Sequence, residues 1–231
     1  VYEHRDEAEA ERDADTVAAT LGLSENALVL DLCCGSGRHD LPLVRRGFRV
    51  VGLDYSPELL AVARQSPENA PEPPLYVRGD ARRPPFMSGS FDAVLNMFTS
   101  FGYFEDVENC AMVCAIADML KPGGGFYIDY LNPPRVLDSI VPESERERNG
   151  CCIIERRTFN ESTRRIEKTI ELERDGDVRR FKESVRLYTL DEMRAIIADA
   201  GLEISGVLGS AAGEPYSEHT DRMIIHGRKA S

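Results

Sequence analysis

The sequence predicts an α/β fold built on a doubly wound sheet of mostly parallel strands. Three observations predict it. Short apolar runs alternate with helical patterns through residues 1–131. A glycine turn, Gly35-Ser36-Gly37, follows the first apolar run, and the period of the pattern changes to two after Pro134. Alternating strands and helices with short turns are typical of a parallel sheet, whereas period-two runs are typical of antiparallel strands.

The elements of the parallel part follow one another closely. We expect strands over 28–32, 48–53, 75–78, 91–95 and 126–131. We expect helices over 1–22 and 38–46, from Pro57 onward, and over 106–120. Ser56 is the N-cap of the third helix, because a serine before a proline is a typical helix start. The four prolines of 67–74 predict a loop, and the glycines of 121–125 end the fourth helix.

Apolar spacing also predicts which helix faces are buried. The expected buried residues are Ala8, Val17, Ala18 and Leu21 in the first helix, Leu59, Leu60, Val62 and Ala63 in the third, and Val107, Cys110, Val113, Cys114 and Ala117 in the fourth.

Residues 143–188 form the second unit of the predicted organisation. Period-two runs over 151–159, 164–174 and 177–188 predict three antiparallel strands, with a hairpin turn at Asp175-Gly176. We expect this insertion to be a lid or a dimerisation subdomain, within a core made of residues 1–142 and 189–231. A helix over 192–200 and strands near 202–208 and 222–228 complete that core.

Charge and composition exclude some classes of function. The chain has 231 residues, 42% of them hydrophobic, and a net charge of −12. This acidity disfavours non-specific nucleic-acid binding, which needs a cationic surface. Residues 143–186 depart from it, with 12 basic and 11 acidic residues. No apolar run is long enough to span a bilayer, and we expect no secretory leader.

The six cysteines do not form a metal-binding pattern. They occur as two vicinal pairs and one pair four residues apart, namely Cys33 and Cys34, Cys151 and Cys152, and Cys110 and Cys114. Such spacings differ from the CxxC arrays of zinc sites. We expect reduced cysteines in a cytoplasmic protein, and no metal.

The candidate site lies where the first two strands end. In an open α/β sheet, ligands bind beyond the carboxyl ends of the strands. The glycine turn would let a ligand approach the backbone, and Asp54 could accept hydrogen bonds from ribose hydroxyls. A dinucleotide-binding fingerprint has a third glycine at the position where this chain has Asp40. A carboxylate there would repel a pyrophosphate. A nicotinamide or flavin site stays open as an alternative.

The string Asp31-x-x-x-Gly35-x-Gly37, with Asp54 ending the next strand, resembles the first motifs of the class I S-adenosylmethionine-dependent methyltransferases. The resemblance covers roughly residues 15–230. It implies a Rossmann-like sheet with an antiparallel last strand, a leading helix over the cofactor cleft, and S-adenosylmethionine as cofactor. It further implies that the cofactor contacts Asp31, Cys33, Gly35, Ser36, Gly37, Arg38, Asp54, Tyr55, Asp80, Ala81, Asn96 and Met97.

The acceptor side is expected to be aromatic. The loop over 96–104 resembles the substrate loop of small-molecule methyltransferases, including amino-sugar N-methyltransferases, whereas it lacks the motif of nucleobase-nitrogen methyltransferases. The resemblance therefore implies a small-molecule acceptor that is methylated on nitrogen or oxygen. We expect this acceptor to contact Phe98, Phe101, Tyr130, Asn132, Arg186 and Tyr188. The aromatic residues could equally be core residues that cover the next helix.

Methyl transfer needs a base only if the acceptor arrives protonated. His219 and Tyr216, in the loop before the last strand, are the candidates, although His219 could be an exposed loop residue. Two other functions stay open on the sequence alone. One is a module that binds S-adenosylmethionine or adenosylhomocysteine without catalysis, and the other is a nicotinamide-dependent oxidoreductase. We expect no membrane partner, and a homodimer is one assembly that the insertion would allow.

Overall fold

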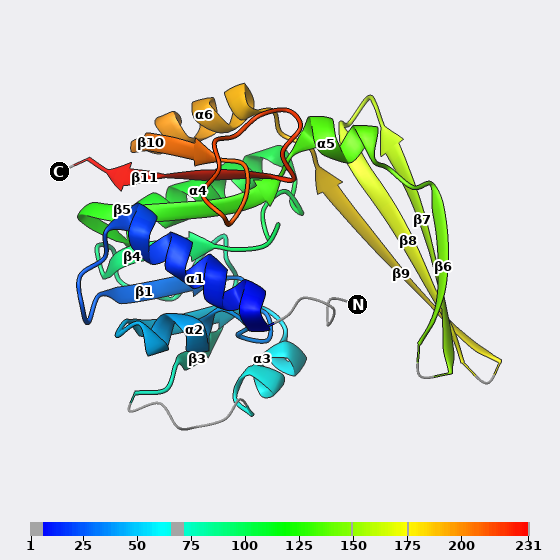
Figure 1. Ribbon diagram of the computed structural model, residues 1–231, viewed down its shortest axis with the longest axis horizontal. Coiled ribbons are helices and arrows are strands. Elements are labelled where there is room, and N and C mark those ends of the chain that lie inside the picture. Colours follow the sequence, from blue (N-terminus) through cyan, green and yellow to red (C-terminus); the bar gives the residue numbers. More distant parts are fainter. Residues whose placement is uncertain (1–6, 66–71, 149, 175, 231) are drawn as a thin grey trace.

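The computed structural model describes residues 7–65, 72–148, 150–174 and 176–230. Its core is a seven-stranded sheet in the order β10-β11-β5-β4-β1-β2-β3 (Figure 1). The strands are β1 (Leu28–Leu32), β2 (Arg49–Asp54), β3 (Leu75–Arg78), β4 (Phe91–Asn96), β5 (Leu120–Leu131), β10 (Leu202–Leu208) and β11 (Arg222–Lys229). Strands β1 to β5 run parallel, whereas β11 is antiparallel to both β5 and β10. The predicted doubly wound sheet with an antiparallel last strand is therefore confirmed.

Helices cover both faces of this sheet. They are α1 (Glu7–Leu21), α2 (Asp40–Arg45), α3 (Pro57–Ala63), α4 (Asp106–Met119), α5 (Pro133–Asp138) and α6 (Leu190–Asp199). Helices α1 and α2 contact each other on one face, and α4 and α6 contact each other on the other face. Successive residues of β1 point to opposite faces, so Val29 packs with α1 and Leu30 packs with α4. Because both faces are covered, β1 is apolar along its length apart from Asp31.

A second sheet stands away from the core beyond α5 (Figure 1). Its strands are β6 (Glu143–Arg148), β7 (Cys151–Asn160), β8 (Arg165–Arg174) and β9 (Asp177–Arg186), all antiparallel. The predicted insertion is therefore present, but it has four strands and not three. The additional strand, β6, reads ESERER and has no apolar residue to mark it. Strands β8 and β9 pair up to Arg174 and Asp177, as a two-residue turn requires, although Asp175 lies outside the described residues.

The ends of several elements differ from the prediction for local reasons. The predicted helix over 1–22 is described from Glu7, and part of the predicted loop over 67–74 falls within 66–71, outside the described ranges. Helix α2 is shorter than 38–46 and begins after His39. Strand β5 begins at Leu120, before the glycines. It pairs through Leu120 with Phe91 and through Gly125 with Ala93, so the residues between bulge out of the ladder.

Several residues that were predicted to be buried on helices α1, α3 and α4 are exposed. Ala8 is exposed, and α1 buries Ala10, Asp13 and Ala14 with Val17 and Leu21. In α3 only Leu60 and Ala63 are buried, while Leu59 and Val62 are exposed. Helix α4 exposes Val107 and Cys114 and buries Asn109, Met112, Val113, Ile116, Ala117 and Met119. Helix α4 carries apolar residues on most of its surface, so spacing alone could not select its buried face.

Candidate functional site

The glycine turn after β1 is held by backbone hydrogen bonds and keeps one side open. The N–H groups of Cys33 and Cys34 both donate to the carbonyl of Leu53, at 2.8 and 3.0 Å. Gly35 and Gly37 have φ values of +58° and +73°. A Cβ on Gly35 would meet nothing within 4 Å, whereas one on Gly37 would overlap the Tyr76 hydroxyl. The turn therefore packs against Tyr76 at Gly37 and has open space beside Gly35.

Asp54 links this turn to the end of β2. Its Oδ2 accepts a hydrogen bond from the Gly35 N–H at 2.9 Å, and its Oδ1 accepts one from the Ser56 N–H at 2.8 Å. Ser56 in turn caps α3 by accepting from the Leu59 N–H, as predicted. Each carboxylate oxygen has a second lone pair, so Asp54 can still accept hydrogen bonds from a pair of ribose hydroxyls.

Asp31 is a buried carboxyl group whose oxygens lack a hydrogen-bond partner among the described residues. It lies on β1 and is 1% exposed. Burial raises the pKa of Asp31 well above its usual range, and the neighbouring carboxyl of Asp40 raises it further. A buried carboxylate without a partner is costly, so this position favours a cationic ligand group.

Asp80 and Tyr55 lie at the ends of the next strands. Asp80 is paired with the guanidinium of Arg82, whose Nη2 lies 2.6 Å from Oδ2, and this pairing lowers the pKa of Asp80. Arg82 also lies over the Phe104 ring. Tyr55 is exposed, with Arg78 over its ring at 5.8 Å.

Three other predicted cofactor residues are buried in the core. Ala81 and Met97 are 5% exposed, and Asn96 is completely buried. The Asn96 side-chain amide donates to the carbonyl of Leu32 at 2.8 Å, which joins the ends of β4 and β1, while its Oδ1 has no partner among the described residues. These side chains shape the floor of the site and present little surface to a ligand.

Arg38, one of the residues expected to contact the cofactor, is paired with acidic residues of α1. Its guanidinium lies 3.1 Å from Asp13 and 3.5 Å from Glu9. His39 is buried and also lies 3.0 Å from the same Asp13 oxygen. Helix α1 is thereby attached to the start of α2, next to the glycine turn.

Phe98 is held between two arginines at the end of β4. The guanidinium of Arg38 lies 5.3 Å from the centre of its ring, and that of Arg222 lies 5.4 Å from it. Arg222 forms a buried ion pair with Asp129 at 2.6 Å, and Asp129 accepts a hydrogen bond from the Phe98 N–H. Phe98 and Arg38 were identified from the sequence. The ion pair of Asp129 and Arg222 was missed, because these two residues are 93 positions apart.

The predicted acceptor residues Phe101, Tyr130 and Tyr188 are buried together. Their ring centres lie 5.5 to 6.4 Å apart. The Tyr130 hydroxyl donates to the carbonyl of Arg186, and the Tyr188 N–H donates to that hydroxyl at 3.2 Å. Within the described residues this cluster joins the insertion to the core, in line with the alternative that these aromatics are core residues.

Arg186 is part of the same junction. It is 9% exposed, and its guanidinium lies 2.8 Å from Glu192 and 3.5 Å from Asp106. It also donates to the carbonyl of Leu187 at 2.6 Å and lies over the Tyr188 ring. The structure thus gives Arg186 protein partners on three sides and leaves little of it to an acceptor.

Asn132, Tyr216 and His219 belong to one loop assembly. Asn132 is buried and its amide donates to the carbonyls of Ser217 and Thr220, at 3.0 and 2.5 Å. The Tyr216 hydroxyl donates to Asn132 Oδ1 at 3.1 Å, and desolvation raises the pKa of Tyr216. His219 is exposed at the tip of this loop. Asn132 therefore positions the loop that carries both candidate bases.

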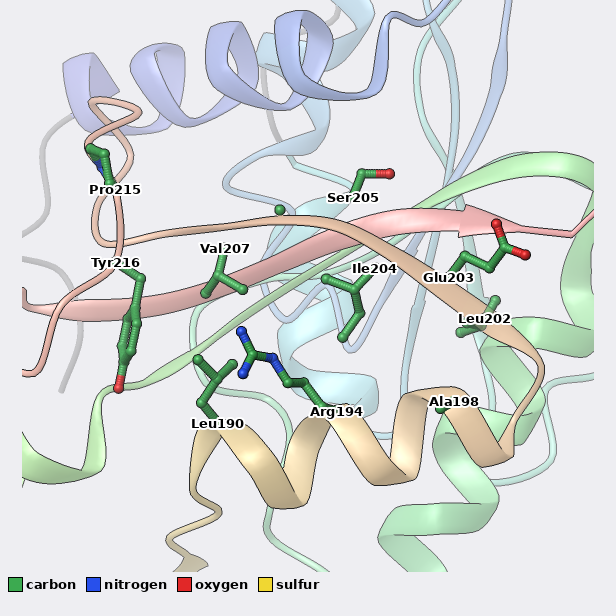
Figure 2. A pocket seen from close by; sticks show the side chains of 11 residues that line it. Leu190, Arg194, Ala198, Leu202, Glu203, Ile204, Ser205, Val207, Pro215 and Tyr216 are labelled. Atoms are coloured by element: carbon green, nitrogen blue, oxygen red, sulfur yellow. The ribbon is translucent and has the colours of Figure 1, made fainter.

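A groove of about 780 Å³ lies on the other side of this loop, between α6 and the edge strand β10. Figure 2 shows Leu190 and Arg194 of α6 facing Ile204 and Val207 of β10, with Tyr216 at one end. No residue of the glycine turn lines this groove. It is therefore separate from the site at the ends of β1, β2 and β4.

Metal-binding clusters and membrane-spanning helices are both absent from the described ranges. No group of three or more His, Cys, Asp or Glu side chains is placed to hold a metal ion there. No helix in the same ranges combines the length and the apolar character needed to cross a bilayer.

Comparisons with known proteins agree with the geometry. A family model described as a methyltransferase domain matches residues 29–124. The cypemycin N-terminal methyltransferase of a Streptomyces species is 32% identical over 205 residues, which span 85% of this chain and 81% of that protein. The dTDP-3-amino-3,4,6-trideoxy-alpha-D-glucopyranose N,N-dimethyltransferase of Streptomyces venezuelae is 29% identical, over 89% of this chain and 87% of that one.

A solved structure shares the whole architecture. It is an amino pentose methyltransferase from Micromonospora echinaspora, determined with S-adenosylmethionine bound. It matches with a TM-score of 0.71 and 26% identity, over 99% of this chain and 93% of that one.

Proposed function

Because this chain belongs to the S-adenosylmethionine-dependent methyltransferases, we propose that it methylates an amine nitrogen of a small molecule. The observation that carries the choice of nitrogen is the extent of the alignments. Two relatives that align over more than four fifths of their length are named as an N-terminal methyltransferase and an amino-sugar N,N-dimethyltransferase. Oxygen stays the second candidate acceptor atom.

The residues at the ends of β1 and β2 fit the cofactor. The open side of Gly35 would let the methionine part lie against the backbone, and Asp54 would hold the ribose hydroxyls. The unpartnered carboxyl of Asp31 would receive the ammonium group. The Asp80 carboxylate and the Tyr55 ring, at the ends of β3 and β2, would contact the adenine. When bound, the cofactor supplies a methyl group on a sulfonium, which is already an excellent leaving group.

The protein therefore contributes orientation and a dry pocket more than chemical activation. Phe98 is the aromatic side chain best placed for this work, since the two guanidiniums fix its ring at the end of β4. Asp129 holds the Phe98 backbone and Arg222 together, so the orientation of the ring depends on this ion pair. We expect the acceptor to lie between this ring and the loop that carries His219.

An amine acceptor must lose a proton before its lone pair can attack the methyl group. His219 is better placed to accept that proton than Tyr216, because Tyr216 donates its own hydroxyl proton to the buried Asn132. The raised pKa of Tyr216 also keeps it protonated at neutral pH. Tyr216 would then position the loop, and His219 would act at its tip.

The insertion is proposed to serve as a dimerisation surface or a lid over the acceptor. Its strands carry cross-strand ion pairs, among them Arg156 and Arg180 with Glu171, and Lys168 with Glu183. These pairs use much of its charge, while Phe181 and Val178 remain exposed on β9. Because the insertion is nearly neutral, two copies could meet there without the repulsion that two acidic cores would experience. We propose the cytoplasm as its location, since all six cysteines are free thiols.

The direct test measures adenosylhomocysteine formed with matched acceptors. Each pair of acceptors would differ only in carrying an amine or a hydroxyl on the same small molecule, with amino sugars included. We expect turnover with the amine and at least tenfold less with the hydroxyl. Turnover of the hydroxyl compounds alone would contradict the choice of nitrogen. Asp54→Ala, which should lose cofactor binding, is the control for background reaction.

A further inference from the structure

Two buried carboxyl groups lie next to each other under the glycine turn. Asp31 is on β1 and is 1% exposed, and Asp40 begins α2 and is fully buried. Within the described ranges, none of their four oxygens has a hydrogen-bond partner. The Tyr76 hydroxyl is also buried there without a partner. Asp31 has the role described above, but no role has yet been given to Asp40.

Other acidic and neutral groups face the pair, so it cannot easily hold two negative charges. Asp54 acts on Asp31, the Cys33 thiol lies near Asp31, and the Cys34 thiol lies near both Asp31 and Asp40. On the side of Asp40 are Tyr76 of β3 and His39, and His39 already lies on Asp13 of α1. Arg38, which precedes His39 in the chain, is likewise paired with Asp13 and Glu9.

Adjacent carboxyl groups in a dry site share a proton, because two like charges at close range cannot both be desolvated. Whichever of Asp31 and Asp40 ionises first raises the pKa of the other, so the two carboxyl groups titrate as a pair. The direction in this structure agrees. Desolvation raises the pKa of Asp40 to about 6, and Asp31 lies well above its usual range.

We propose that Asp31 and Asp40 share one proton in the free protein, and that the ammonium group of the bound cofactor displaces this proton. Asp40 is then a positioning residue. It holds the proton that keeps the empty site close to neutral, and it adds its charge to that of Asp31 once the ammonium is present. The displaced proton passes to the solvent buffer. This inference rests on the placement of the cofactor ammonium at Asp31 and is independent of the acceptor.

The consequence is a cofactor affinity that depends on pH. At a pH below the pKa of the pair, binding must expel a proton, so the affinity for adenosylhomocysteine should rise by up to about tenfold per pH unit. Above that pKa the pair is already ionised, and the rise should level off. The amino group of adenosylhomocysteine titrates too, but that contribution is the same for every variant.

The experiment is calorimetric titration of ligand-stripped protein with adenosylhomocysteine. It is done near pH 6 in two buffers of different ionisation enthalpy, which gives the number of protons released per ligand bound. The wild type should release roughly half a proton or more. Asp40→Asn removes Asp40's share of the displaced proton and the neighbouring charge that helps to keep a proton on Asp31, so it should release fewer protons than the wild type, and its affinity should level off at a lower pH. Asp40→Leu, which removes the polar group at similar volume, should behave like Asp40→Asn.

Each outcome decides the matter. Equal proton release by the wild type and both variants would overturn the proposal, as would no proton release by the wild type alone, a result that needs no variant to fold. If the wild type binds no adenosylhomocysteine at any pH, the cofactor placement itself fails. That failure differs from a failure of proton sharing, because the wild type should bind adenosylhomocysteine at pH 8 whether or not Asp31 and Asp40 share a proton.

Discussion

Gly37→Ala is the sharpest structural perturbation of the glycine turn. The backbone φ of +73° is one that alanine adopts at a cost of about 1–2 kcal/mol. The added Cβ would overlap the Tyr76 hydroxyl, and it would also lie 3.0 Å from the Tyr76 Cζ and 3.2 Å from the Ala63 Cβ. Overpacking of this kind costs about 1–3 kcal/mol, so the free energy of unfolding should fall by about 3 kcal/mol in total.

The Tyr76 ring cannot easily move away from the new methyl group. On its other side it lies against Gly52, where a Cβ would be only 2.8 Å from the ring. Removing the hydroxyl should therefore relieve the overlap directly. Tyr76→Phe alone should change stability by less than about 1 kcal/mol, because the buried hydroxyl has no partner to lose among the described residues.

The assay is a double-mutant cycle by urea denaturation. Gly37→Ala should cost about 3 kcal/mol in the wild type but only about 1–2 kcal/mol in the Tyr76→Phe background, which leaves the backbone part. The coupling of about 1 kcal/mol reports contact between the two side chains. The same cost for Gly37→Ala in both backgrounds would show that the turn does not rest on Tyr76. Gly89→Ala is the matched control, since Gly89 also has a positive φ but open space around it.

Three further predictions concern buried charges. The raised pKa of Asp40 means that the folded protein is penalised as the pH rises from about 4, the pKa in the unfolded chain, through about 6. Asp40→Asn removes that penalty, so its stability relative to the wild type should grow by up to about 3 kcal/mol over this range in urea denaturation, and a constant difference would refute the linkage. The side chain of Glu192, the partner of Arg186, is 35% exposed, so Arg186→Ala should lower the free energy of unfolding by about 1 kcal/mol. The affinity for adenosylhomocysteine, measured by calorimetry, should stay within twofold, and a loss of affinity with unchanged stability would contradict the position of Arg186 at the junction. Asp129→Ala leaves Arg222 buried and unpaired and should also cost about 3 kcal/mol; restoration by the double variant with Arg222→Met would confirm the cause, and no restoration would argue against it.

The sequence predicted the local parts of the site well. The glycine turn, Asp31 and Asp54 all belong to one strand–turn–helix–strand unit within 27 residues, so their spacing determines their geometry. The prediction that Ser56 caps a helix was confirmed for the same reason. Patterns of this kind depend on backbone geometry alone, and backbone geometry is encoded in neighbouring residues.

The parts that depend on distant pairing could not be predicted. Phe101, Tyr130 and Tyr188 were expected at the acceptor, but β9 brings Tyr188 onto the other two from more than 50 residues away. The pairing of Arg38 with Asp13 was missed, since nothing in the segment around Arg38 indicates a partner 25 positions earlier. Long-range ion pairs leave no periodic signal in the sequence. An aromatic residue in a core cannot be distinguished by sequence from one that lines a pocket.

Strand β6 shows the same limit in secondary structure. Its six residues are all charged or serine, and it forms a strand because its backbone pairs with that of β7. Charged residues are common on edge strands, where they discourage pairing with other molecules. A pattern based on apolar alternation cannot detect such a strand.

The central claim is that the glycine turn and Asp54 hold an adenosyl sulfonium compound. Calorimetric titration of ligand-stripped protein with adenosylhomocysteine tests it most directly, with Asp54→Ala and Glu58→Ala compared side by side. We predict saturable binding of one ligand per chain, a loss of affinity of about tenfold or more in Asp54→Ala, from hydrogen bonds to a charged group worth about 1.5–3 kcal/mol, and little change in Glu58→Ala. No binding by the wild type, or equal affinity in all three proteins, would contradict the claim.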